Sequence, residues 1–544
     1  MVLYIMKSNE TKNQIAFEFR SVTKTFGKII ANNKISFSVP KGSIRALVGE
    51  NGAGKSTAMK ILFGLYKEDS GEVLVNGKPQ HWNSPRDAIK NGIGMVHQHF
   101  MLAETATGLD NIILGDESDS LKLPFIPLSL NIIDRKKAKI KIENIAKKYG
   151  LSVPLDIKIS KLPVGMQQRI EILKLLYRDA EILILDEPTA VLTPLEVDEL
   201  FVNLKKLKDE GKTIIIVTHK LKEVLNFTDH ITIFRSGQVI GNLETKEANE
   251  EKIASMMVGR NVNLKPKIPC NTNLRGPVLN ITNVTLKDYK TKDSKRNLLN
   301  KINLSVSGGE IVGIAGVEGN GQSDLLDLIF HPQKYFGKKS SQNNPASGEI
   351  SLLGNDIKHK KSSEMADINV GFIPEDRHTE GLLLNMSAEE NYILGRHWET
   401  KFRFGFLQNI KKIKETVKNE METYDVRPRN SELLATGFSG GNQQKIIIAR
   451  EFGKNPNFIV AANPTRGVDI GAIEFIHKQI VEERDKGVGI LLISSELDEI
   501  TTLSDRIIVL YEGEIVAEYR RDQANEYQIG LAMCGGHPQE GVQK

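Results

Sequence analysis

An apolar run leads into a glycine-rich turn in the stretch Ile44-Arg45-Ala46-Leu47-Val48-Gly49-Glu50-Asn51-Gly52-Ala53-Gly54-Lys55-Ser56-Thr57. From Gly49 to Ser56 the turn matches the pattern G-x-x-x-x-G-K-[ST] without a mismatch. Glycines let backbone N–H groups point at phosphate oxygens, and the start of a following helix adds positive potential. The stretch therefore predicts a nucleotide-binding loop between a strand and a helix. Lys55 would reach the β- and γ-phosphates, and the Ser56 hydroxyl would bind Mg²⁺.

An acidic pair, Asp186 and Glu187, follows the apolar run at 182–185. His219 follows a second such run at 213–217. The carboxyl ends of parallel strands meet at the edge where open α/β sheets bind ligands, so we expect these side chains near the phosphate loop. Asp186 suits the metal shell, and Glu187 suits a base that polarises the attacking water.

Weaker signals surround these residues. Gln98 follows a short apolar run at 93–96, and its neighbours His97 and His99 raise the less favoured alternative of a metal site. Phe26 lies 29 residues before Lys55 and is a candidate for stacking on adenine, with core packing as the alternative. Each of these residue types also occurs in purely structural roles.

The chain repeats itself once. A second strand and glycine turn occupy residues 311–322, and Gln322 lies 267 positions after Lys55. A later pair of motifs, residues 162–169 and 438–445, is offset by 276 positions. Motifs that recur in order at a nearly constant offset indicate tandem homologous domains.

Short apolar strands alternate with longer amphipathic stretches, which predicts an α/β fold with a parallel-sheet core in each half. A helical insertion of roughly 105–160 in the first half, and of 382–436 in the second, separates the glycine loop from the later motif. We place one domain at 1–262, a linker rich in proline at 263–275, and a second domain at 276–544.

Composition narrows the class of protein. Of 544 residues, 40% are hydrophobic and 26% charged, which is ordinary for globular domains and excludes a wholly disordered chain. The formal net charge of +5 is small for this length, so no nucleic-acid partner is expected. Two cysteines, Cys270 and Cys534, cannot form a zinc cluster. No run approaches the ~18 to 20 apolar residues that a membrane span needs.

The motifs together resemble the ATP-binding subunit of an ATP-binding cassette (ABC) transporter in which two cassettes are fused. The stretch Ser439-Gly440-Gly441-Asn442-Gln443-Gln444-Lys445 matches the signature motif of that family. Three further stretches resemble those of importers of ribose-type sugars and of nucleosides, namely residues 316–322, 374–377 and 461–467. The loop 316–322 favours the nucleoside branch.

The resemblance implies two tandem P-loop NTPase domains, each with a helical subdomain, that pair head to tail. Each ATP would lie between one phosphate loop and the opposite signature motif. The implied cofactors are ATP and Mg²⁺. The implied partners are transmembrane permease subunits and, indirectly, an extracytoplasmic solute-binding protein, which places the chain on the cytoplasmic face of the cell membrane.

Motif and resemblance together assign the site residues. Catalytic roles fall to Glu187, His219 and Gln98, and Mg²⁺ binding falls to Ser56, Gln98 and Asp186. ATP contacts are expected from Gly49, Glu50, Asn51, Gly52, Ala53, Gly54, Lys55, Ser56, Thr57, Phe26, Ser439, Gly440, Gly441 and Asp469.

The two halves depart from the family pattern in opposite ways. The second half has lost its catalytic groups, with Gln322, Ala462, Asn463, Glu375 and Ser495 in place of Lys55, Asp186, Glu187, Gln98 and His219. The first half has a weakened signature, with Pro163 and Val164 for serine and glycine, and Thr193 where the second has Asp469. Head-to-tail pairing would gather the intact parts into one composite site, with Glu187 as base and Ser439 and Gly441 gripping the γ-phosphate.

Other functions stay open as alternatives. The same role in a ribose- or galactose-type sugar importer is the nearest one. A soluble tandem-cassette ATPase acting on ribosomes is disfavoured by Asn463 and by the short linker. A nucleotide-binding regulator without turnover would need Glu187 or His219 to be idle. We also expect the apolar residues 100–102 to be exposed beside Gln98 and to pass motion to membrane partners, with ordinary packing as the alternative.

Overall fold

The computed structural model describes residues 14–27, 29–98, 100–115, 120–121, 132–189, 192, 194–261, 268–288, 297–317, 319–337, 345–361, 364–365, 367–523, 525–533 and 535–536. The chain divides into two compact units, Met1–Val262 and Asn263–Lys544, and each is described by itself. His99, Thr193, Glu318 and Cys534 lie outside the described residues.

The first unit is built on a six-stranded sheet whose order is β12-β11-β3-β10-β9-β6. Five neighbouring strands run parallel and β12 pairs antiparallel at the edge. The bounds are β3 (Ile44–Gly49), β6 (Ile93–Val96), β9 (Ile182–Asp186), β10 (Thr213–Val217), β11 (His230–Arg235) and β12 (Gln238–Glu244). The predicted parallel core is confirmed.

A separate antiparallel sheet, which the sequence analysis does not anticipate, lies in the same unit. Its order is β2-β1-β4-β5, with β1 (Ile15–Phe26), β2 (Ile29–Pro40), β4 (Ser70–Val75) and β5 (Lys78–Gln80). Helix α2 (Lys55–Leu62) packs between the two sheets, because its buried Met59 shares one cluster with Phe17 of β1 and Ile184 of β9.

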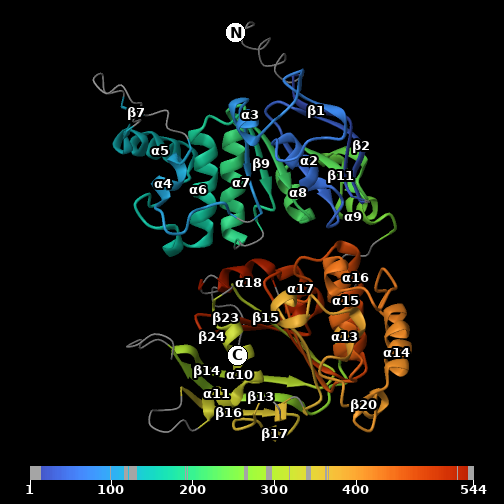
Figure 1. Ribbon diagram of the computed structural model, residues 1–544. Coiled ribbons are helices and arrows are strands. Elements are labelled where there is room, and N and C mark those ends of the chain that lie inside the picture. Colours follow the sequence, from blue (N-terminus) through green and yellow to red (C-terminus); the bar gives the residue numbers. More distant parts are fainter. Residues whose placement is uncertain are drawn as a thin grey trace. The chain divides into compact units, whose positions relative to one another are not determined.

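The other face of the large sheet packs against helices, as Figure 1 shows for α6 and α7. Leu183 and Leu185 of β9 face this layer while Ile182 and Ile184 face α2, so alternate residues of one strand are buried on opposite sides. The bounds of the helices of this unit other than α2 are α3 (Pro85–Lys90), α4 (Gly108–Ile113), α5 (Arg135–Tyr149), α6 (Val164–Tyr177), α7 (Pro194–Asp209), α8 (Leu221–Phe227) and α9 (Glu250–Val258).

The second unit repeats this plan. Its large sheet has the order β18-β21-β22-β15-β23-β24, and its small antiparallel sheet β14-β13-β16-β17. The bounds are β13 (Pro277–Lys287), β14 (Asn297–Ser307), β15 (Ile311–Ala315), β16 (Ala346–Leu352), β17 (Asn355–Asp356), β18 (Val370–Ile373), β21 (Phe458–Ala462), β22 (Gly489–Ser494), β23 (Arg506–Tyr511) and β24 (Glu514–Arg520).

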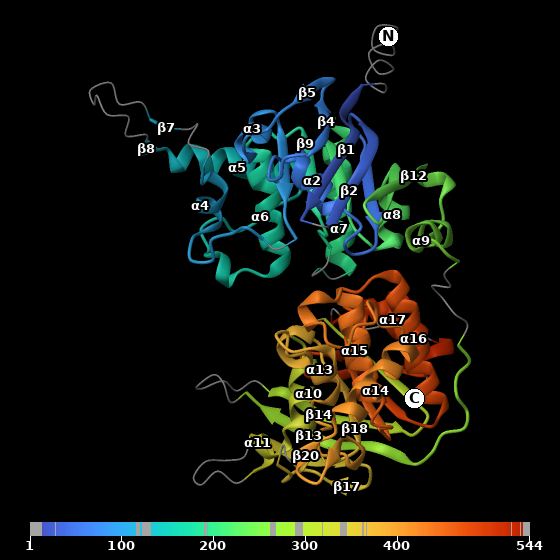
Figure 2. The ribbon, with the colours of Figure 1, turned by 45° about the vertical axis from the view of Figure 1, so that its right-hand side comes forward.

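Helix α10 (Gln322–Phe330) takes the place of α2, with Leu325 and Ile329 buried between the sheets. The helices on the opposite face include α15 and α16, grouped with α13 and α14 in Figure 2. The bounds of the helices of this unit other than α10 are α11 (Pro332–Phe336), α13 (Ala388–Ile393), α14 (Ile410–Thr423), α15 (Gly440–Phe452), α16 (Ile470–Asp485), α17 (Leu497–Leu503) and α18 (Glu526–Met533).

A helical subdomain interrupts each unit at the predicted place. In the first it contains α4 and α5, with a short ladder of β7 (Ser120–Leu121) and β8 (Ile132–Ile133). In the second it contains α13, a hairpin of β19 (Arg403–Phe404) and β20 (Leu407–Gln408), and α14. Within the described residues, no helix is long and apolar enough to cross a membrane.

Candidate active site

The glycine turn of the first unit connects β3 to α2 in a backbone shape that requires glycine. Gly52 has φ +79° and Gly54 has φ +98°, in the left-handed region that side chains disfavour. A Cβ at Gly54 would lie 2.3 Å from the Ala31 carbonyl oxygen, and Asn32 Nδ2 donates to the Gly54 carbonyl at 3.0 Å. The turn is therefore held against β2.

Lys55 opens α2 and folds back over the turn. Its Nζ donates to the carbonyl oxygens of Gly49 at 2.8 Å and of Glu50 at 3.0 Å, and the side chain is 6% exposed. Burial lowers the pKa of Lys55, while the charges of Glu187 and Asp186 act in the opposite direction. The ammonium group therefore lies inside the loop that the sequence predicts to bind phosphates.

Ser56 and Asp186 face each other across the loop and the sheet edge. The Ser56 hydroxyl donates to Asp186 Oδ1 at 3.1 Å, and Asp186 ends β9 in a buried position. Burial raises the pKa of Asp186, and the hydrogen bond from Ser56 partly offsets this. Two oxygen donors in contact are the ligand type that Mg²⁺ prefers, so the residues present fit this ion.

Glu187 is the centre of a second cluster. Its carboxylate accepts a hydrogen bond from Gln98 Nε2 at 2.9 Å and lies 3.1 Å from His219 Nδ1. Its backbone has φ +49°, and its N–H donates to the Val217 carbonyl at 2.8 Å. The structure therefore brings Gln98, Glu187 and His219 together, from the ends of three neighbouring parallel strands.

The electrostatics of Glu187 keep it ionised. Burial by itself raises the pKa of this carboxyl, but the hydrogen bond from His219 and the charges of His219, Lys55 and Lys220 outweigh it, so the pKa is lowered. A partly buried, ionised carboxylate beside a phosphate loop can accept a proton from an attacking water.

The aromatic candidate lies at the end of β1. Phe26 is 42% exposed, so the core-packing alternative for it is wrong. Its ring centroid lies 5.1 Å from that of Tyr66, in an edge-to-face arrangement. Tyr66 carries no motif in the sequence, and only the fold brings it beside Phe26.

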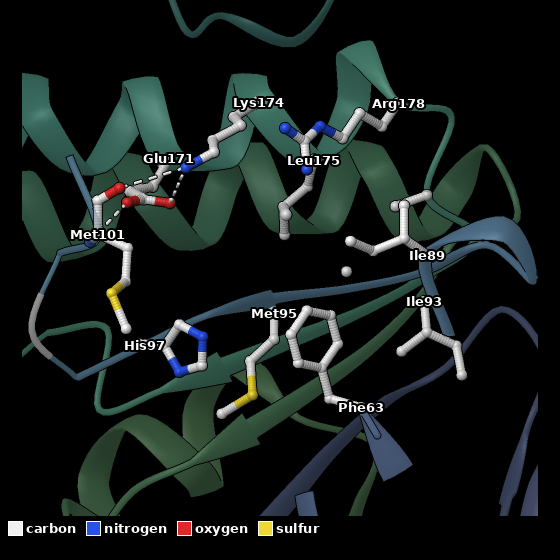
Figure 3. A pocket seen from close by; sticks show the side chains of 12 residues that line it. Phe63, Ile89, Ile93, Met95, His97, Met101, Glu171, Lys174, Leu175 and Arg178 are labelled. Atoms are coloured by element: carbon white, nitrogen blue, oxygen red, sulfur yellow. Dashed lines mark hydrogen bonds and ion pairs between the residues drawn. The ribbon is translucent and has the colours of Figure 1, made fainter. Parts of the chain in front are cut away.

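His97 lines a cavity of about 120 Å³, and neither Gln98 nor Glu187 is among its lining residues. Figure 3 shows its ring near Met95 and Phe63, and the centroids of His97 and Phe63 lie 6.0 Å apart. Burial lowers the pKa of His97.

Of the three apolar residues expected to be exposed beside Gln98, Met101 is 66% exposed, whereas Leu102 packs against the core and Phe100 is half-buried. The expectation therefore holds for Met101 alone.

The glycine loop of the second unit keeps the shape but loses the charge. Gly321 has φ +108°, matching Gly54. Gln322 is 8% exposed and donates from Nε2 to the Val317 carbonyl at 3.1 Å, as Lys55 does to Glu50. Among the described residues its Oε1 has no hydrogen-bond partner. A neutral amide thus occupies the place of the lysine ammonium.

Asn463 occupies the place of Glu187. Its φ is +44° and its N–H donates to the Ile493 carbonyl at 2.7 Å, so the backbone is the same. Its Oδ1 accepts from Ser495 N at 2.9 Å and from Ser495 Oγ at 3.3 Å. An amide held this way cannot serve as a base. Glu375, the counterpart of Gln98, is paired instead with Arg466 Nη1 at 2.6 Å.

The signature motif of the second unit begins α15. Ser439 is the N-cap residue, and its hydroxyl accepts from Asn442 Nδ2 at 2.8 Å. A Cβ at Gly441 would lie 2.7 Å from Asp469 Oδ2, and Asp469 caps α16 by accepting from Ala472 N at 2.8 Å. Ser439, Gly440, Gly441 and Asp469 therefore lie close to one another.

The corresponding motif of the first unit is built differently. Pro163 precedes α6, and Val164 is 42% exposed at the first position of the helix. A proline has no hydroxyl, and a valine side chain covers backbone that a glycine would leave open. The weakened signature is thus visible in the geometry as well as in the sequence.

Three supporting residues make contacts that the sequence does not predict. Asn32 holds the Gly54 carbonyl, and no motif marks it. Arg377 donates to the Arg466 carbonyl at 2.7 Å, and the short sequence pattern around it was its only signal. Ser495 is recognised as a replacement for histidine, but its two contacts with Asn463 are visible only in the structure.

Several known proteins are similar in sequence to this chain over nearly their whole length. A profile of the family described as ABC transporter matches residues 32–190 and 299–466. The guanosine import ATP-binding protein NupO of Bacillus subtilis is 44% identical over 97% of this chain and 99% of its own length. The nucleoside import ATP-binding protein NupA of Lactococcus lactis is 43% identical over 97% and 100%. The glucose import ATP-binding protein TsgD13 of Haloferax volcanii is 40% identical over 95% of both chains.

Two matches to one family profile, in two units of the same fold, account for the repeat in the sequence. The phosphate loop, the acidic pair and the signature motif all fall on or beside the matched residues. The chain belongs to the ABC transporter family, as an ATP-hydrolysing subunit in which two ATP-binding cassettes are joined.

Proposed function

We propose that this chain powers the import of nucleosides across a membrane, using one hydrolytic site. The observation that carries the proposal is the contact of Glu187 with Gln98 and His219 beside the phosphate loop. The substrate class is supported by the relatives, since two nucleoside or guanosine import proteins are 43–44% identical to this chain.

The hydrolytic site is composite in this proposal. The phosphate loop, from Gly49 to Thr57, binds ATP in the first unit, and Phe26 stacks on the adenine. The second unit would pair head to tail with the first and contribute the residues that contact the γ-phosphate, which are Ser439, Gly440, Gly441 and Asp469. The first unit, 1–262, is therefore the hydrolysing domain, and the second, 276–544, contributes the signature.

Within that site each polar residue has one task. Glu187 accepts the proton of the attacking water, and His219 holds the Glu187 carboxylate in place and ionised. Mg²⁺ would be held by Ser56 and Asp186 with Gln98, and would neutralise charge on the phosphates. The site that contains Gln322 and Asn463 does not hydrolyse ATP, because it has neither a lysine ammonium nor a basic carboxylate.

The partners follow from the transport role. Transmembrane permease subunits would carry the substrate, and an extracytoplasmic solute-binding protein would deliver it. The chain itself would then sit on the cytoplasmic face of the cell membrane. Closing of the two units on ATP, and their release after hydrolysis, would drive the permease between its states.

A simple sugar is the second candidate substrate, and the 40% identical glucose import protein favours it. No residue of an ATPase subunit touches the cargo, so the two candidates differ only in the partners they need. They are therefore separated by transport experiments and not by the site.

The test is ATP turnover in proteoliposomes that contain this chain, its co-purified membrane partners and the solute-binding protein. Stimulation by nucleosides alone supports the proposal. Stimulation by simple sugars alone overturns the substrate class in favour of the second candidate. If no membrane protein co-purifies with the chain, the import role itself is wrong and a soluble ATPase becomes the better reading.

A further inference from the structure

The segment that follows β18 is tied to the loop that follows β21. Arg377 Nη1 donates to the Arg466 carbonyl at 2.7 Å, and Nη2 donates to the Gly467 carbonyl at 3.4 Å. Arg466 in turn donates from Nη1 to Glu375 Oε1 at 2.6 Å. Each segment thus donates to the other from one arginine side chain. We name this set of contacts, among Glu375, Arg377, Arg466 and Gly467, the arginine clamp.

The same guanidinium lies against the first turn of α15. A Cβ at Gly440 would be 2.8 Å from Arg377 Nη2 and 3.1 Å from the Gly467 carbonyl oxygen. Glycine at 440 therefore lets the clamp approach the helix backbone directly. The residue that caps this helix, Ser439, is the immediate neighbour of the contact.

A second contact joins the same segment to α15. His378 Nε2 lies 3.0 Å from Gln443 Oε1, and Gln443 Nε2 donates to the Ala435 carbonyl at 2.9 Å. Asp376 accepts from the backbone of His378 at 2.8 Å and so stabilises the turn that carries both Arg377 and His378. The segment therefore contacts the first turns of α15 at two places, Gly440 and Gln443.

The sequence of the first unit has no arginine at either corresponding position. Counting from Gln98 and from Glu187, the counterparts of Arg377 and Arg466 are Phe100 and Ala190. Neither can donate a hydrogen bond from its side chain. This is also the unit whose signature is weakened, so both arginines occur only in the half that has kept an intact signature.

We propose that Arg377 is a positioning residue for ATP hydrolysis. By fixing Gly440 against the loop 466–467, it holds the Ser439 hydroxyl and the N-terminus of α15 in the orientation that engages the γ-phosphate. The inference rests on the proposed composite site. It adds to that site a residue that does not touch nucleotide and acts through the signature motif.

The experiment compares Arg377→Ala and Arg377→Lys with Arg429→Ala, in the full chain with its membrane partners. Arg429 is an exposed arginine of the same unit that pairs with Glu422, so its removal is the matched control. We expect kcat to fall about tenfold in Arg377→Ala, because two charge-assisted hydrogen bonds are lost. Lysine has no forked guanidinium and cannot donate to both carbonyls at once. The kcat of Arg377→Lys should therefore lie between those of Arg377→Ala and the wild type.

Two further readouts separate positioning from general damage. The Kd of ADP should change less than about twofold, because ADP has no γ-phosphate for the signature to hold. Gly440→Ala should lower kcat in the wild-type background, and clearly less in the Arg377→Ala background, because the added methyl group then no longer meets the guanidinium. If Arg377→Ala does not fold, Arg377→Lys carries the same cycle.

Wild-type kcat in Arg377→Ala overturns the proposal, and so do strictly additive effects of the two substitutions. Glu187→Gln, measured in the same assay, separates a failure of the proposed role of Arg377 from a failure of the proposed composite site. If Glu187→Gln retains turnover, the composite site is wrong. If Glu187→Gln is inactive while Arg377→Ala is normal, only the role of Arg377 is wrong.

Discussion

His219 Nδ1 and Glu187 Oε1 lie 3.1 Å apart at the edge of the first large sheet, and this contact helps to lower the pKa of the carboxyl. Burial pushes the pKa of Glu187 up, and the hydrogen bond from His219, together with the charges of His219, Lys55 and Lys220, more than compensates. The base is therefore ionised at neutral pH even though its side chain is only 16% exposed.

Removing the histidine should move the acid limb of the pH profile. In His219→Ala the hydrogen bond that lowers the pKa of Glu187 is gone while burial remains, so the pKa rises. A base must be deprotonated to act, and the midpoint at which kcat falls on acidification should shift to higher pH. We would measure kcat between about pH 4 and 8, each variant relative to its own plateau. His81→Ala, at an exposed histidine, should leave the midpoint where it is, and an unmoved midpoint in His219→Ala contradicts the assignment.

Glu187→Gln should lower ATP turnover by about a hundredfold or more, the usual range for loss of a general base. Asn463→Ala changes the equivalent position in the second unit, where Ser495 already occupies the side-chain oxygen, and turnover should stay within about twofold. The measurement is phosphate release at saturating ATP. Equal losses in the two variants would show that the sites are not specialised.

Asp186→Asn should raise the Mg²⁺ concentration needed for half-maximal turnover by about tenfold or more, because a carboxylate ligand becomes a neutral amide. Direct binding of Mn²⁺ in the presence of ATP would provide a readout independent of activity. Asp179→Asn, an exposed position in the same unit, is the control and should behave as wild type. An unchanged metal requirement in Asp186→Asn would remove Asp186 from the metal shell.

Gly54→Ala and Gly52→Ala separate crowding from backbone strain. Both glycines have positive φ, so each alanine costs about 1–2 kcal/mol of conformational strain. At Gly54 the methyl group also meets the Ala31 carbonyl oxygen at 2.3 Å and Asn32 Nδ2 at 2.5 Å, whereas nothing lies within 4 Å at Gly52. The unfolding transition of the first unit is identified by its shift with ADP. The free energy of unfolding measured from it should fall by at least about 1 kcal/mol more in Gly54→Ala than in Gly52→Ala. Equal destabilisation by the two alanines would mean that the loop moves away from β2 at little cost.

The sequence alone determined the features that depend on local chemistry. A glycine turn with lysine and serine between a strand and a helix has few other interpretations, and the replacement of Lys55 by Gln322 is a change of charge that needs no coordinates. The repeat, the α/β class and the helical insertions follow from spacing, because spacing reflects the connectivity of parallel strands. Carboxyl ends of such strands meet at one edge, which is why Asp186, Glu187 and His219 were predictable as neighbours.

Only the tertiary structure decided which side chains touch. Gln98 lies 89 residues before Glu187, and no local pattern states that its amide donates to that carboxylate. The antiparallel sheet beside α2, the Tyr66 ring beside Phe26 and the contact of Arg377 with Gly440 arise in the same way. Each joins segments far apart in the chain, and side-chain contacts between distant segments are set by packing in three dimensions. The sequence therefore specifies the chemistry available to the site, and the fold specifies which groups meet.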